Sequence, residues 1–128
     1  GKALFQASGC AGCHMPSFKT GKAEGQPHLS AQRIWPYSDF LLHDMGEGLA
    51  DGRPEGDATG QEWRTAPLWG VGLTQVVSGH TFLLHDGRAR NVEEAILWHG
   101  GEAQAARDAY AALSPEERAA LLAFVNSL

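Results

Sequence analysis

The sequence predicts an all-α fold, with a helix at each end of the chain, further helices in its last third and a long glycine-rich loop between the ends. Three observations predict this class: residues typical of helix boundaries near both ends, an alanine-rich stretch, and a central segment rich in glycine. A length of 128 residues with 43% hydrophobic side chains is ordinary for one globular domain. We therefore expect residues 1–128 to form a single domain around one core.

The two ends carry the helix signals that define this fold. Lys2–Ser8 reads as a short helix that stops at Gly9. Near the other end, Ser114 is an N-cap, Pro115 occupies the first helical position, and Glu117 completes a capping box. The apolar stripe expected on this last helix is Leu121, Leu122, Val125 and Leu128.

Two further helices are expected between the ends. Asn91 caps the first of them, acidic residues follow in its first turn, and Gly100-Gly101 stops it. Glu102–Leu113 is alanine-rich and favours a second helix. Gly46–Gly60 predicts a long surface loop, whereas Pro67–Phe82 fits either a helical turn or two short strands.

The most informative motif is Cys10-Ala11-Gly12-Cys13-His14, a C-x-x-C-H pattern typical of covalent haem attachment. Two thiols at this spacing form thioethers with the vinyl groups of one haem, and the imidazole that follows binds the iron. The chain has no other cysteine, so a zinc site lacks a second pair of soft ligands. A redox dithiol is the remaining alternative, but it expects a βαβ setting. The motif therefore predicts one haem c held by Cys10, Cys13 and His14.

A helix at each end, the first running into C-x-x-C-H, resembles the arrangement of cytochrome c domains, in which the two helices cross and pack over one covalently bound haem. We expect the crossing to involve Gly1, Phe5, Leu121 and Val125.

Charge and hydropathy exclude several classes of function. The formal net charge of -5 argues against nucleic-acid binding, and no apolar run reaches the length of a membrane span. Haem is joined to C-x-x-C-H after export, so we expect a periplasmic location.

The residues alone do not decide which side chain is the second axial ligand of the iron. His99 has the strongest local case, because Val92, Ala95, Ile96 and His99 are spaced to share one helical face. A lone histidine on such a face is otherwise more often a hydrogen-bonded core residue. Met45 and His85 are the alternatives, although His85 and His43 also fit hydrogen-bonding roles in turns.

Three further segments resemble the C-terminal haem domain of the di-haem oxidoreductase family, which is related to the bacterial di-haem cytochrome c peroxidases. With the C-x-x-C-H motif they occur in the family's order, and the resemblance covers Gly1 to Leu128. The segments are Pro36 to Gly46 (PYSDFLLHDMG), Arg64 to Gly70 (RTAPLWG), and His85 to Ile96 (HDGRARNVEEAI) continuing into His99 to Ala103 (HGGEA).

The resemblance sharpens the expected ligation. In the related peroxidases a methionine binds the high-potential haem from the position that His99 occupies here. The substitution implies bis-histidine ligation by His14 and His99, which lowers the reduction potential relative to a methionine-ligated haem. Family members are usually longer, so the resemblance also implies that this domain is the C-terminal part of a longer chain.

These inferences predict periplasmic electron transfer through one haem, with a redox protein or an upstream haem domain as partner. We do not expect enzyme activity of this domain alone, although a longer parent could be an oxidoreductase. The alternative is a peroxidase-like haem domain whose distal ligand is displaced on activation.

Other residues have weaker predicted roles. Arg64 and Arg88 are candidates to pair with haem propionates, since a guanidinium matches a carboxylate in a bidentate way. Trp35 could line the haem pocket and reach a propionate through its indole N–H, and Pro67 is expected to pack on the porphyrin. Asp51–Glu62 partly matches a calcium-binding loop, but an arginine at its third position argues against one.

Overall fold

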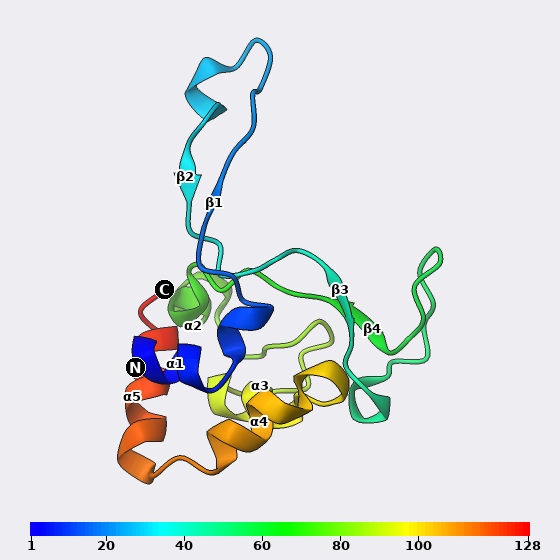
Figure 1. Cartoon of the computed structure of the whole chain (residues 1–128). Helices are drawn as coiled ribbons and strands as arrows, with labels where there is room; N and C mark the ends of the chain where they lie inside the picture. Colours follow the sequence, from blue (N-terminus) through cyan, green and yellow to red (C-terminus); the bar gives the residue numbers. More distant parts are fainter.

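A computed structural model describes all of residues 1–128 and shows helices packed together, with one small β-ribbon projecting above them and a second lying beside them (Figure 1). The α-helices are α1 (Lys2–Ala7), α2 (Thr74–Ser78), α3 (Val92–Trp98), α4 (Gln104–Ala111) and α5 (Pro115–Val125). The strands are β1 (Phe18–Lys19), β2 (Arg33–Ile34), β3 (Leu42–Asp44) and β4 (Glu62–Arg64). Short 3₁₀ turns include η1 (Cys10–Gly12), η3 (Glu47–Leu49), η4 (Val71–Leu73) and η5 (Gly101–Ala103).

The expectation of an all-α cytochrome c fold was wrong, because the fold is mixed α/β. β1 pairs with β2 and β3 pairs with β4, each pair forming a two-stranded antiparallel sheet. The strands are two or three residues long, too short for an alternating pattern to stand out in the sequence. Each strand forms because it pairs with a segment that lies well separated from it in the sequence. In the register of β3 and β4, for example, His43 lies opposite Trp63.

The predicted crossing of the first and last helices is present. α1 packs against α5, and Phe5, Leu121 and Val125 belong to one buried core cluster with Tyr37 and Tyr110. Gly1 lies at the crossing, where an added Cβ would collide with Ala120 and Phe124 of α5. The predicted capping box of Ser114 and Glu117 begins α5. Local sequence signals therefore identified this interface correctly.

The internal helices also follow their sequence signals. The side chain of Asn91 accepts a hydrogen bond from the backbone N–H of Glu94 and caps α3, which ends immediately before His99. α4 lies within the alanine-rich stretch, and its Tyr110 is fully buried. The undecided segment Pro67–Phe82 forms the short helical elements η4 and α2, not strands.

The two β-ribbons extend from the helices in different directions. The β1–β2 hairpin projects away from the rest of the chain, whereas the glycine-rich segment Gly46–Gly60 connects β3 to β4 (Figure 1). This segment is largely exposed, as expected for a loop, except for the fully buried Leu49. None of the helices has the length and apolar character that spanning a membrane requires.

Candidate functional site

A large, mainly apolar cavity lies between α1 and η1, the β3–β4 sheet, and helices α3, α4 and α5. Only 12 of the 128 residues are buried, which is few for a domain of this length, because many apolar side chains face this cavity instead of one another. The ionisable and sulfur-containing residues of its lining are Cys10, Cys13, His14, His43, Met45, Arg64, His85, His99, Glu102 and Arg107. The cavity is therefore the place where a bound group would complete the core.

His14 follows the C-cap residue of η1, Cys13, and lines this cavity. Its Nδ1 lies 2.9 Å from the carbonyl oxygen of Tyr37, and a carbonyl can only accept, so Nδ1 carries the hydrogen. Burial lowers the pKa of the His14 imidazole below its ordinary value, which keeps the ring neutral. A neutral ring protonated at Nδ1 leaves the lone pair of Nε2 free, the form in which histidine binds a metal.

His99 has the same arrangement on the other wall. Its Nδ1 donates to the carbonyl oxygen of Ala95 at 2.7 Å, one turn earlier. Burial also lowers the pKa of the His99 imidazole, which keeps the ring neutral. Because Nδ1 carries the hydrogen, the lone pair of Nε2 is free here as well. All four residues of the predicted apolar helix face line the cavity: Val92, Ala95, Ile96 and His99.

The spacing of these two rings fits one metal ion between them. The ring centroids of His14 and His99 are 6.5 Å apart, and the planes are tilted by 45°. Two imidazoles on opposite sides of one metal, each at a metal–nitrogen distance of about 2 Å, have centroids roughly 6 to 6.5 Å apart. The 6.5 Å distance is too long for stacking of the two rings and fits two imidazoles that bind the same metal ion. The donor set and the apolar lining therefore suit a haem iron.

The cysteines of the motif lie at the edge of the same cavity, in η1 and the residue that follows it. Cys10 and Cys13 are both partly buried and free of a disulfide. Burial raises the pKa of both thiols, so in the absence of a bound group they are protonated. Their position beside His14 is suited to thioether bonds with one haem.

The two alternative distal ligands also border the cavity, but their surroundings differ from those of His99. The Nε2 of His85 is 2.8 Å from the carbonyl oxygen of Arg64, and its ring packs edge-on against Trp63. That hydrogen bond matches the role in a turn expected for His85. Met45 lines the cavity at the end of β3. The ring of His99 lies 6.5 Å from that of His14, whereas the ring of His85 contacts Trp63 instead.

The structure brings together some of the remaining predicted residues and separates others. Arg64 and Pro67 line the cavity. Arg88 lies outside its lining, where it pairs with Asp86 at 2.6 Å and donates to the carbonyl oxygen of Gly48. Trp35 is half exposed on the β1–β2 hairpin beside Arg33, also outside the lining. Of the residues assigned to propionates, Arg64 is therefore the one at the cavity.

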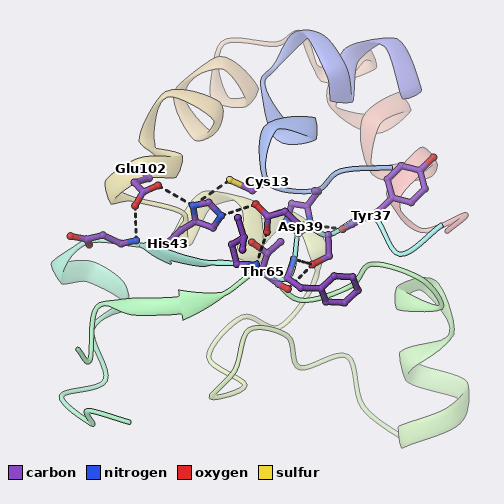
Figure 2. A network of polar contacts seen from close by, with 11 residues as sticks. Cys13, Tyr37, Asp39, His43, Thr65 and Glu102 are labelled. Atoms are coloured by element: carbon purple, nitrogen blue, oxygen red, sulfur yellow. Dashed lines mark hydrogen bonds and ion pairs between the residues drawn. The ribbon is translucent and has the colours of Figure 1, made fainter. Parts of the chain in front are cut away.

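A polar network at the rim of the cavity was not identified as such from the sequence (Figure 2). His43 lies between two carboxylates: its Nε2 is 2.8 Å from Asp39 Oδ2, and its Nδ1 is 2.9 Å from Glu102 Oε2. Cys13 Sγ is 3.9 Å from the same Nδ1. Asp39, His43 and Glu102 come from separate segments, so only the hydrogen-bonding role expected for His43 was accessible from the sequence.

The acidic loop has a structural explanation that needs no cation. Asp51 Oδ1 accepts a hydrogen bond from the backbone N–H of Arg53, and Glu62 Oε2 accepts one from the N–H of Thr59. These carboxylates stabilise turns of the loop.

Comparison with known proteins gives one result that covers the whole chain. The family model described as "Di-haem oxidoreductase, putative peroxidase" matches residues 1–128. No curated protein and no solved structure matches significantly.

Proposed function

Because this chain belongs to the di-haem oxidoreductase family, a family of haem proteins, we propose that it transfers electrons through one haem attached to Cys10 and Cys13 and held by His14 and His99. The 6.5 Å separation of the two imidazole rings is the observation that carries the proposal. We further propose that the protein works in the periplasm, with a redox protein or a second haem domain as its partner.

The haem supplies a one-electron iron centre when it is bound. The chain's own residues determine how that centre behaves. His14 and His99 present neutral Nε2 atoms from opposite walls, and the carbonyl oxygens of Tyr37 and Ala95 hold the two rings in that tautomer. A haem iron held by both His14 and His99 would have no coordination site left for a substrate, which favours electron transfer over peroxide cleavage.

The apolar walls contribute a second property. Phe5, Leu121 and Val125 of the helix crossing line the cavity, so the packing of α1 on α5 keeps water away from the His14 side. Exclusion of water strengthens the hydrogen bonds that orient the ligands. Arg64 lies at the cavity and is suited to pair with a propionate.

The proposal is tested by spectroscopy of the protein produced with a haem-maturation system. We expect one covalent haem per chain by mass spectrometry, and a low-spin absorption spectrum in both redox states with slow binding of carbon monoxide. His99→Ala should convert the iron to high spin and open it to carbon monoxide. Cys10→Ala and Cys13→Ala should each remove one thioether.

Matched variants separate the candidate ligands. Met45→Ala and His85→Ala should leave the low-spin spectrum unchanged, because the proposed ligand on that side of the iron is His99, whose ring lies 6.5 Å from that of His14. A low-spin spectrum that survives His99→Ala but is lost in Met45→Ala or His85→Ala would reassign the ligand. Rapid high-spin conversion or peroxide turnover by the unmodified protein would instead favour a peroxidase-like domain.

A further inference from the structure

His99 stands just before a turn that is pressed against strand β3. Gly100 and Gly101 follow it, and an added Cβ on Gly100 would lie 2.9 Å from the carbonyl oxygen of Met45. On Gly101, where φ is +51°, it would collide with the carbonyl oxygen of Asp44 and lie 2.6 Å from the backbone nitrogen of Gly46. The backbone after His99 therefore meets the end of β3 with no space for a side chain.

Glu102 joins the same two segments through its carboxylate. Oε1 accepts a hydrogen bond from the backbone N–H of Asp44 at 3.0 Å, and Oε2 accepts one from Nδ1 of His43 at 2.9 Å (Figure 2). Both acceptor atoms are used on β3. The side chain is 57% exposed, so it is not held in place by burial. Its position depends on these two hydrogen bonds.

The Nε2 atom of His43 is linked to the haem-attachment motif through Asp39. Nε2 donates to Asp39 Oδ2 at 2.8 Å, and the backbone N–H of Asp39 donates to the carbonyl oxygen of Cys13 at 2.8 Å. The side chain of Asp39 is only 6% exposed. A continuous path of hydrogen bonds therefore runs from Cys13, beside His14, through Asp39 and His43 to Glu102.

We propose that His43 is a positioning residue, which with Asp39 and Glu102 forms a bridge that holds the His99 turn on β3 and keeps His99 opposite His14. This inference rests on the proposed ligation by His14 and His99. Both ring nitrogens of His43 face carboxylate oxygens, which only accept, so the bound ring donates from both sides as an imidazolium. Charge-assisted hydrogen bonds of this kind are stronger than neutral ones.

The role of the bridge follows from where it acts. α3 presents His99 at its C-cap, where its N–H still bonds to the carbonyl oxygen of Ile96. The helix ends there, so its hydrogen bonds do not hold the residues that follow His99. The bridge and the glycine contacts hold those residues from outside the helix. Without them the His99 turn would move away from β3 more often, and the iron would be exposed to external ligands for a larger fraction of the time.

The test is the rate of carbon monoxide binding to the reduced haem protein, measured with the spin state and the melting temperature. Glu102→Ala should raise the rate by about tenfold or more, because an incoming ligand must wait for His99 to leave. His43→Gln should have a similar effect, and the double variant should add little, since both changes break one bridge. Glu102→Gln keeps an oxygen acceptor for the N–H of Asp44 and should fall between wild type and Glu102→Ala.

Glu55→Ala is the matched control, because it removes the same charge from the exposed loop between β3 and β4. Its rate should equal that of wild type. If wild type binds carbon monoxide slowly and the bridge variants bind it within twofold of the wild-type rate, the inference is overturned. The proposed ligation would still stand in that case. If Glu55→Ala accelerates carbon monoxide binding equally, the inference is also overturned, because the effect would then come from the loss of any negative charge. If the wild-type protein is already high-spin and binds carbon monoxide rapidly, the proposed ligation itself is wrong, and the inference fails with it.

Discussion

The two histidines of the site reach the same geometry by opposite routes. His14 is identified by the residues next to it, yet its ring is oriented by the carbonyl oxygen of Tyr37, 23 residues away. His99 has no motif of its own, yet its ring is oriented by the carbonyl oxygen of Ala95 in its own helix. A ligand that is obvious in the sequence can thus depend on tertiary structure for its orientation, and the reverse also holds.

This comparison predicts that different mutations weaken the two sides. The His14 side should respond to changes in the core where α1 crosses α5, and the His99 side to changes in the turn against β3. Of the four predictions that follow, the first acts on the His14 side, the second on the His99 side and the third on the packing of α3, the helix that presents His99. The last compares the two sides.

Phe5→Ala should have the largest effect on stability. The Phe5 ring lies 6.4 Å from the His14 ring, 6.0 Å from Tyr37 and 5.5 Å from Phe124, between centroids. Its loss removes core contacts and leaves a cavity, which costs about 3 to 5 kcal/mol. Denaturant unfolding measures this change. Phe82→Ala is the control, since Phe82 is 55% exposed and its removal should cost much less; equal losses would contradict the assignment of Phe5 to the core.

Gly101→Ala should act on the His99 side. The positive φ and the collision with Asp44 force the turn away from β3, at a cost of about 1 to 3 kcal/mol. We also expect a larger high-spin fraction and faster carbon monoxide binding. Gly21→Ala is the matched control outside the cavity, because φ there is not positive and a Cβ meets nothing within 4 Å. An unchanged spectrum in Gly101→Ala would show that the turn does not position His99.

High pH should weaken the packing of α4 on α3. Burial, together with the hydrogen bond from the phenol to Glu93, raises the pKa of Tyr110 to about 12. The unfolded chain ionises near pH 10, so between pH 10 and 12 it releases a proton that the folded chain keeps. The free energy of unfolding should therefore be unaffected by this group below pH 10 and fall by about 2 to 3 kcal/mol as the pH rises through 12.

Tyr110→Phe tests the assignment of that pH dependence, because it removes the ionisable group and keeps the ring. Its free energy of unfolding should vary less between pH 10 and 12 than that of wild type. Identical pH profiles would assign the loss to other groups.

The smallest predicted effects come from the helix caps. Ser114→Ala removes the cap of α5, and Asn91→Ala removes that of α3; each should cost about 1 kcal/mol. Only Asn91→Ala should also accelerate carbon monoxide binding, because α3 presents His99 and α5 does not. Acceleration of the same size in Ser114→Ala would mean that global stability, and not the position of α3, controls access to the iron.

Much of the helical part of the fold could be predicted, because helix boundaries are encoded locally. The cap at Asn91 and the capping box at Ser114 each satisfy backbone groups within a few residues, so the sequence alone reveals them. The strands could not be predicted. His43 pairs with Trp63 across a long loop, and nothing in either short segment indicates its partner.

The candidate site divides in the same way. The sequence determined the attachment motif at Cys10, Cys13 and His14, and the apolar face of α3 that ends at His99, since both depend on spacing along the chain. Only the tertiary structure decided that the two rings face each other at 6.5 Å, and that Asp39 and Glu102 meet at His43. Such contacts depend on how separate segments pack, and packing is a property of the whole fold and not of any one segment.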